Sequence, residues 1–309
     1  MTVVLEIGRC GFESSRLIQS LGADVHIVPM NKLTISSKSK RAKSDRLDAE
    51  FLSRLNLEET PRVWIPSSKQ SSRRKLLECR ENKQKEINRI NLRLQSFIAY
   101  APFRLSSLDK KMPFPQWRET LNTWKQQVPD LFDLVLWEEM FDLLDRLELA
   151  EKSYKRTMDR IEAQEGIDRQ KCQEENIEHI VDKIRKIKGF GVHSSRVFAW
   201  YIGDFTRFSN GKKFSSYLGL TPTPYSSCKT RKEMGISKSG KPILRQMAVQ
   251  IAWLWRRYQP DTWLVKKWEA QLKNKRSRKT SIIAMARQLM VALYRFIVHD
   301  EIIEGMIVE

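Results

Sequence analysis

The pattern of apolar and polar positions predicts a small α/β unit at the start of the chain. Residues 2–7 form a short apolar run that stops at Gly8, which is typical of a buried strand. Residues 12–21 carry apolar side chains at helical spacing, and residues 25–28 form a second apolar run closed by Pro29. A strand, a helix and a strand within about thirty residues indicate a parallel sheet.

A further helix is predicted after the basic segment of residues 32–43. Asp45 lies at the start of this helix, directly after a serine suited to the N-cap. Its apolar face consists of Leu47, Phe51, Leu52 and Leu55. Pro61 and Pro66 then mark a boundary, so we expect the first domain to span residues 1–65.

Two long amphipathic helices are predicted in the middle of the chain. Apolar residues recur every three or four positions within residues 69–100 and again within residues 134–161. A segment rich in Pro and Trp, residues 101–124, is expected to be a linker between them. Such helices pair as an antiparallel coiled coil or dimerise, and the pattern fits packing within one chain as well as an oligomer. Residues 66–177 are therefore expected to form a coiled-coil and linker region.

A predicted pair of helices opens the C-terminal region. Isoleucines mark a helix face over residues 180–187, the segment Gly189-Phe190-Gly191 interrupts it, and residues 194–202 resume a helix. This is the helix-hairpin-helix pattern, in which backbone N–H groups at a helix start face a phosphate. An ordinary helical hairpin has the same pattern.

The remaining C-terminal residues are expected to be mostly helical. Long helices are predicted over residues 241–258, which include Arg245, and over residues 281–298. A basic run, residues 274–279, lies between them and suits a surface that follows a nucleic-acid backbone. The third domain is therefore expected to be an α-helical domain of residues 178–309.

The charge of the chain indicates a polyanionic partner. Lys and Arg number 56 against 37 Asp and Glu, a net charge of +19 with a pI near 9.8. An excess of this size favours nucleic acid as the partner. No run of about 18 apolar residues predicts a membrane span, and no secretion signal is recognisable. The four Cys and four His are scattered without zinc-ligand spacing, so reduced thiols in a cytoplasm are expected.

Three carboxylates form a candidate Mg²⁺ site. Glu6 ends the first predicted strand, and Asp45 and Asp48 share one face of the following helix. Hard oxygen ligands suit Mg²⁺, which polarises a phosphate during phosphodiester cleavage. A helix N-terminal charge at Asp45 and a solvated Asp48 are the alternative interpretation.

A second candidate site combines hydroxyls and cations. Ser226 and Ser227 precede Lys229, Arg231 and Lys232. One of the serines can act as a nucleophile toward a phosphate that the cations bind. The alternative is an ordinary surface loop, since no His or Asp partner stands nearby in the sequence.

Together these segments resemble the DEDD transposases of the one-hundred-and-ten family of bacterial insertion sequences. The signature K-x-D-R-x-D-A occupies residues 43–49 and follows an E-x-G-x-x-G segment at residues 6–11. The later motifs of the series are Gly189-Phe190-Gly191, Ile202-Gly203-Asp204-Phe205, Tyr217-Leu218-Gly219-Leu220-Thr221-Pro222, Tyr225-Ser226-Ser227-Cys228 and Ile236-Ser237-Lys238-Ser239-Gly240. The ordered series covers nearly the whole chain.

The resemblance implies a RuvC-like (ribonuclease-H-like) N-terminal domain, a coiled-coil middle and a C-terminal transposase domain. It implies DNA recombination by a homo-oligomer, a dimer or tetramer, guided by a structured RNA in the bacterial cytoplasm and nucleoid. Matched by position, Glu6, Asp45 and Asp48 are acidic residues that hold Mg²⁺, and Ser227 is the nucleophile. The residues expected to bind DNA or RNA are Gly189, Gly191, Lys229, Arg231, Lys232, Lys238 and Arg245.

Two departures from the family pattern shape the expectations. Cys228 stands where the family has glycine after the nucleophile, which removes backbone freedom there. The family's first acidic residue lies on an earlier strand, and the sequence begins only five residues before Glu6. We therefore expect an N-terminal truncation that leaves residues up to Leu57 poorly stable and the chain unable to recombine DNA. A non-catalytic nucleic-acid-binding remnant is the alternative function, and a repair-type helix-hairpin-helix protein is a third.

Overall fold

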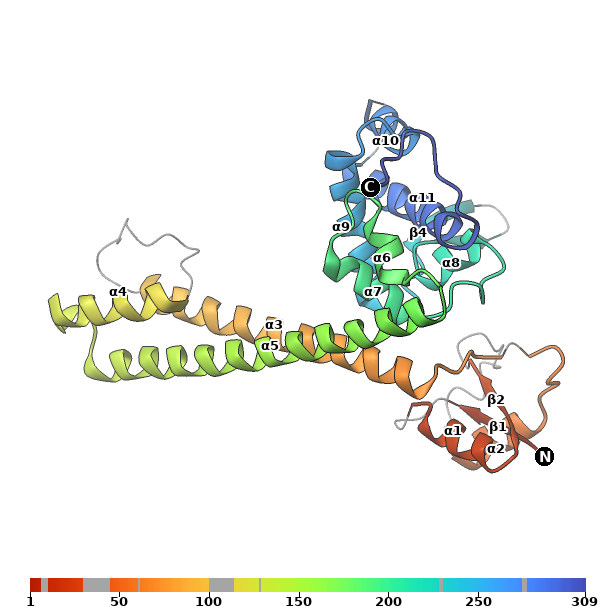
Figure 1. Ribbon diagram of the computed structural model, residues 1–309, viewed down its shortest axis with the longest axis horizontal. Coiled ribbons are helices and arrows are strands. Elements are labelled where there is room, and N and C mark those ends of the chain that lie inside the picture. The colour runs from red at the N-terminus through yellow and green to blue at the C-terminus, as the bar shows by residue number, and fades with distance from the viewer. Residues whose placement is uncertain are drawn as a thin grey trace. The chain divides into compact units, whose positions relative to one another are not determined.

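The chain folds into two compact units, Met1–Ser72 and Arg73–Glu309, in the computed structural model (Figure 1). The structure describes residues 1–6, 11–29, 45–60, 62–99, 114–127, 129–227, 230–273 and 277–309. Each unit is considered by itself below.

The first unit is built on a two-stranded parallel sheet, as predicted. Its elements are β1 (Thr2–Glu6), α1 (Glu13–Ser20), β2 (Asp24–Val28) and α2 (Asp45–Ser53). The register runs from Thr2 opposite Asp24 to Glu6 opposite Val28. Helix α1 packs against β2, and α2 contacts β1. This arrangement is consistent with an α/β unit, while the RuvC-like topology stays a prediction, because two strands do not define it.

The segment after α2 is tied to the free side of β2. The Val63 N–H donates to the Ile27 carbonyl at 2.9 Å. Arg16 of α1 donates to the Pro66 carbonyl at 2.7 Å and to the Ser71 hydroxyl at 3.2 Å. Among the described residues, β1 pairs with β2 alone.

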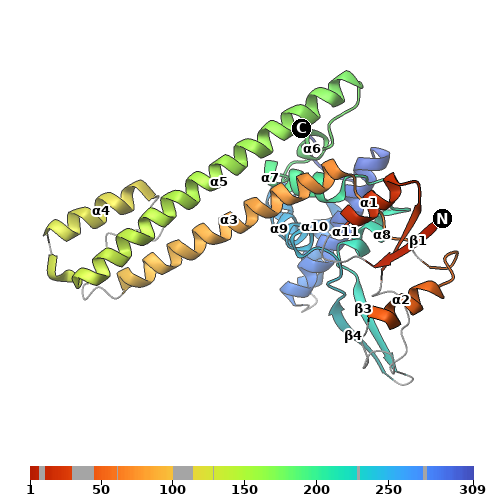
Figure 2. The ribbon, with the colours of Figure 1, turned by 90° about the horizontal axis from the view of Figure 1, so that it is seen from below.

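Two long antiparallel helices, α3 (Ser68–Ala99) and α5 (Leu134–Glu174), form a helical arm (Figures 1 and 2). Lys83 of α3 donates to the Thr157 hydroxyl at 2.6 Å and to the Ser153 carbonyl at 2.9 Å. Arg73 forms an ion pair with Asp168 nearer the other end of α5. The two predicted helices therefore pair within one chain, with α5 longer than expected.

The predicted linker between these helices was wrong in its second half. A helix, α4 (Phe114–Gln127), and a short 3₁₀ turn, η2 (Pro129–Leu131), lie between α3 and α5. Trp117 and Leu121, four residues apart, are buried on one face of α4. They join a cluster with Leu94 of α3 and Trp137 of α5. Tryptophan at helical spacing thus marked an amphipathic helix that packs on the end of the arm.

The rest of the second unit is a mainly helical domain. Its elements are α6 (Ile180–Arg185), α7 (Val192–Ile202), α8 (Gly211–Tyr217), β3 (Pro222–Ser227), β4 (Thr230–Ile236), α9 (Pro242–Tyr258), α10 (Trp263–Lys273) and α11 (Arg278–His299). Helix α7 is buried from Ser194 to Ile202, and α11 packs against α8, α9 and α10. Of the described helices, α11 alone is long and apolar enough to cross a membrane, but 56% of its most apolar window is buried in this core.

A group of ion pairs joins the base of the arm to this domain. Glu165 of α5, which is 1% exposed, pairs with Arg196 of α7 and with Arg169. Arg169 also donates to Asp182 of α6 at 2.7 Å, and this hydrogen bond raises the pKa of Arg169 and lowers that of Asp182. The buried carboxylate is thus compensated by two guanidinium groups.

Candidate active site and nucleic-acid-binding surface

The candidate nucleophile lies at the end of a β-hairpin. Strands β3 and β4 pair antiparallel, with Ser227 opposite Thr230 and Ser226 opposite Arg231. Ser227 is the last residue of β3. Cys228 and the predicted phosphate ligand Lys229 lie outside the described residues. The described residues of this segment lie in strands and not in an irregular loop.

Two further predicted cations belong to the same hairpin. Arg231 and Lys232 lie in β4, opposite Ser226 and Tyr225 in the register. Prolines 222 and 224 weakened the strand pattern in the sequence, because proline is confined to the edges and irregularities of sheets. A two-stranded hairpin consists of edges, and a register irregularity lies between these two prolines.

Two family motifs meet at the base of this hairpin. Gly219 and Gly240 both have positive φ, +72° and +77°. A Cβ at Gly219 would collide with the Ser239 backbone, and one at Gly240 would collide with the Tyr217 carbonyl oxygen. The Lys238 N–H donates to the Gly219 carbonyl at 3.2 Å. Only glycine allows the two segments to approach this closely.

Arg245 of α9 takes part in the same junction. It donates to the Ser239 carbonyl at 3.0 Å, and its predicted role in nucleic-acid binding stays a prediction. Lys238 is exposed and remains accessible beside the hairpin. The Ser237 N–H donates to the Thr221 carbonyl at 2.9 Å, which ties the ends of β3 and β4 to this junction.

We expect Gly219→Ala to lower the free energy of unfolding by more than about 2 kcal/mol, because it combines an unfavourable φ with a backbone collision. Gly166→Ala is the matched control: Gly166 lies within α5 and has nothing near its Cβ position. That change should be neutral or stabilising, since alanine favours a helix. Thermal and urea unfolding of both variants provide the measurement. Equal stability of the two would show that the junction does not constrain the fold.

The acidic residues belong to the first unit. Glu6 is the exposed last residue of β1, Asp45 begins α2, and Asp48 lies one turn further along. Helix α2 contacts β1, so the helix that carries Asp45 and Asp48 packs on the strand that ends at Glu6. Side-chain positions of Asp45 and Asp48 fall outside the described part of the structure, within which no group of three metal-ligating residues occurs. The Mg²⁺ site therefore stays a prediction.

The glycine-containing turn joins two helices, as predicted. Gly189 has a φ of +105°, and Gly191 is the N-cap of α7. Phe190 between them is buried against Phe198 and Trp255, at ring distances of 6.1 and 6.4 Å. Gly191 and the residue after it are exposed, which leaves the start of α7 open to a ligand. Phosphate binding there stays a prediction.

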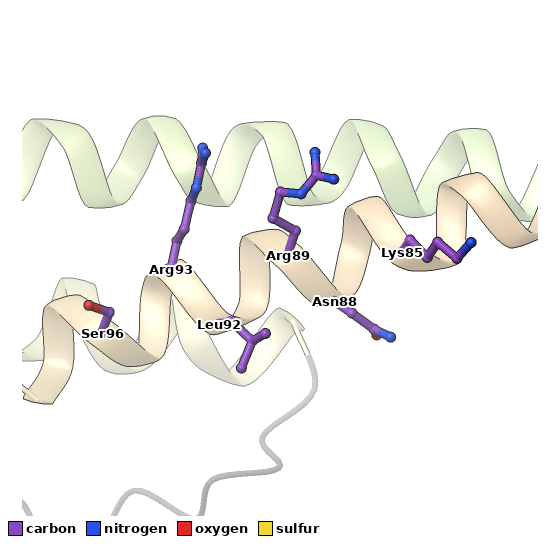
Figure 3. A pocket seen from close by; sticks show the side chains of 6 residues that line it. All are labelled: Lys85, Asn88, Arg89, Leu92, Arg93 and Ser96. Atoms are coloured by element: carbon purple, nitrogen blue, oxygen red, sulfur yellow. The ribbon is translucent and has the colours of Figure 1, made fainter. Parts of the chain in front are cut away.

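A basic stripe on the arm was not identified from the sequence. Lys85, Arg89 and Arg93 lie four residues apart on the exposed face of α3 and line a shallow groove of about 450 Å³ (Figure 3). Figure 3 shows Arg89 and Arg93 extending to the same side of the helix. Within the described part of the chain, none of the three forms an ion pair. The four-residue spacing of basic residues was the signal that could have revealed it.

Comparison with known proteins places the hairpin and the glycine-containing turn in one matched region. Residues 181–265 match the family model "Transposase IS116/IS110/IS902 family". "Putative transposase y4rJ" of Sinorhizobium fredii is 29% identical over an alignment 334 positions long, which covers 99% of this chain and 79% of that protein. "Putative transposase y4qE" of the same organism is 26% identical over 257 aligned residues, which cover 81% of this chain and 57% of that protein.

Proposed function

We propose that the chain, which is similar to transposases of the IS116/IS110/IS902 family, recombines the DNA of an insertion sequence through a serine nucleophile. The observation that carries the proposal is the position of Ser227. It ends a strand of a hairpin whose base is held by two close-packed glycine-containing segments. That hairpin lies within the region matched to the family.

The proposed chemistry is a phosphoryl transfer. The Ser227 Oγ attacks the phosphorus of a phosphodiester, forming an O–P bond as the bond to a sugar oxygen breaks. The proton lost from the serine balances the one gained by the released sugar hydroxyl. A hydroxyl of another strand then reverses the step at the same phosphorus. Because the serine–phosphate link retains the energy of the broken phosphodiester bond, strand joining needs no external energy source.

Cations of the hairpin support this assignment. Arg231 and Lys232 lie on the strand paired with the one that ends at Ser227. A phosphodiester carries a negative charge that grows on its oxygens in the transition state, and nearby cations stabilise it. Lys238 is exposed beside the hairpin base and adds a further cation.

Glu6, Asp45 and Asp48 are proposed to hold Mg²⁺. Their carboxylate oxygens are the donors that Mg²⁺ prefers, and Glu6 is exposed at the end of a strand that α2 contacts. When bound, the ion would polarise a phosphate oxygen. Structured guide RNA and a homo-oligomer, a dimer or tetramer, complete the proposal, supported by the resemblance and, for RNA, by the +19 charge.

Replacing Asp48 by Asn should weaken Mg²⁺ binding at least tenfold and strand joining at least about a hundredfold, because one ligand charge is lost. Glu50→Gln is the matched control on the same helix, since Glu50 is exposed and pairs only with Arg54 among the described residues. Calorimetric Mg²⁺ titration measures binding separately from activity. Unchanged Mg²⁺ affinity in Asp48→Asn would remove Asp48 from the site.

The function itself is tested by a recombination assay on two plasmids, one with the element's ends and one with a target. The 309-residue protein is supplied with a transcript of the element's non-coding end. Joined plasmids support the proposal. Tight nucleic-acid binding without joining would identify a non-catalytic remnant instead.

A further inference from the structure

A cavity of about 480 Å³ lies between α8, the start of α10, and α11. Its lining residues include neither the hairpin serine nor any of the three acidic residues. The lining residues that matter here are Lys212, Ser215, Thr221, Trp263, Arg287 and Arg295. A volume of this size accommodates one small organic ligand.

The walls of the cavity are held close by direct backbone packing. Gly211, at the start of α8, faces α11: a Cβ there would lie 2.9 Å from Val291 Cγ1 and 3.1 Å from the Val291 carbonyl oxygen. The N-terminus of α8 is capped by Asn210, which accepts from the Lys213 N–H at 2.9 Å. Tyr294 of α11 donates to the Phe208 carbonyl at 2.6 Å. The cavity is therefore preformed, with its two main walls fixed.

The charge of the cavity points to an anion. Lys212, Arg287 and Arg295 line it, and no carboxylate is among the lining residues. Neither Lys212 nor Arg287 forms an ion pair with any residue that the structure describes. Arg295 Nε is 3.7 Å from Glu301, and both side chains are more than half exposed, so this pair is weak. Three gathered cations repel one another unless an anion binds among them.

An unsatisfied hydroxyl lies on the same cavity. Ser215 is 1% exposed, and its Oγ has no hydrogen-bond partner among the described residues. A buried polar group without a hydrogen-bond partner is uncommon in folded proteins, and this one belongs to a residue that lines the cavity.

An aromatic ring completes the site. Trp263, the first residue of α10, is 39% exposed and lines the cavity beside the cations. Aromatic rings next to cationic groups bind nucleotides, with the base on the ring and the phosphate on the cations. Lipid headgroups and inorganic phosphate would not require the ring.

We propose that this cavity binds one unpaired nucleotide of a nucleic-acid strand, with its phosphate at Lys212 and Arg287 and its base against Trp263. Thr221 lies at the cavity and directly precedes β3, the strand that ends at Ser227. A strand held in the cavity is therefore bound beside the root of the hairpin. The same chemistry also fits a free nucleotide. That the ligand is part of a strand rests on the proposed function.

The test is binding of a ten-nucleotide deoxythymidine strand, measured by fluorescence anisotropy with the full chain. Arg287→Gln and Trp263→Ala should each weaken binding about tenfold, as loss of a charged hydrogen bond or a stacked base does. The controls are Arg160→Gln, an exposed cation of α5, and Trp253→Ala, which is 38% exposed. Both should stay within about twofold of the parent. Thermal unfolding confirms that each variant is folded.

Two further experiments distinguish a nucleotide within a strand from a free nucleotide. A strand carrying 5-iododeoxyuridine should crosslink to the peptide that contains Trp263, and thymidine monophosphate should compete only weakly. Tight binding of the monophosphate, with no effect of either variant on the strand, would identify a free-nucleotide site and overturn the proposal. Equal affinities and no crosslink would overturn it as well. Ser227→Ala should bind the strand normally, so failure of recombination alone counts against the proposed function and leaves the cavity assignment standing.

Discussion

Ser227→Ala is expected to abolish strand joining and the covalent protein–DNA adduct, whereas Ser226→Ala leaves both largely intact. Removing the attacking oxygen lowers the rate of a reaction that needs a covalent intermediate by at least about ten-thousandfold. The remaining groups still bind the substrate, but no nucleophile is left. The two serines are neighbours in β3, and consecutive positions of a strand belong to opposite faces.

The measurement uses radiolabelled DNA and a denaturing gel, on which a phosphoserine link retards the DNA with the protein. Both variants are made in the 309-residue chain. Ser226→Ala is the matched control, since it removes an identical hydroxyl one position away. Adduct formation that survives in Ser227→Ala but is lost in Ser226→Ala would reverse the assignment.

Nucleic-acid affinity is expected to fall about a thousandfold or more between 50 and 200 mM salt. The expectation follows if six or more phosphates are contacted, because each neutralised phosphate releases bound counterions. The net charge of +19 supplies the cations, and the stripe of Lys85, Arg89 and Arg93 on α3 offers three of them. Structured RNA should compete with DNA, since both present the same backbone charge.

Anisotropy titrations at several salt concentrations give the slope of log affinity against log salt. Replacing Lys85, Arg89 and Arg93 together by Gln should reduce the magnitude of that slope by up to about three. The matched triple variant replaces Lys155, Arg156 and Arg160, which are exposed on α5, and should leave the slope nearly unchanged. An affinity that is flat across this salt range would remove the electrostatic argument for nucleic-acid binding.

Much of the local structure was predictable because it repeats within a few residues. The apolar runs at residues 2–7 and 25–28 became β1 and β2, and their parallel pairing followed from the short helix between them. The long periodic stretches became α3 and α5. Strand β3 and helices α8 and α10 were not predicted. The prolines of β3 weaken the strand pattern, and the two helices are short, so their stability comes from packing and not from a repeated pattern.

The candidate site also has a part that was predictable from the sequence and a part that was not. Ser227, Glu6, Asp45 and Asp48 could be proposed from the sequence, because motifs of fixed spacing and order carried the family resemblance. The amino-acid sequence by itself also determined the positive charge and hence the class of partner. Tertiary structure alone decided that α3 pairs with α5 in one chain, and that Gly219 meets Ser239. It also brought Lys212, Trp263 and Arg287 to one cavity, because residues far apart in sequence become neighbours only through the packing of α8, α10 and α11.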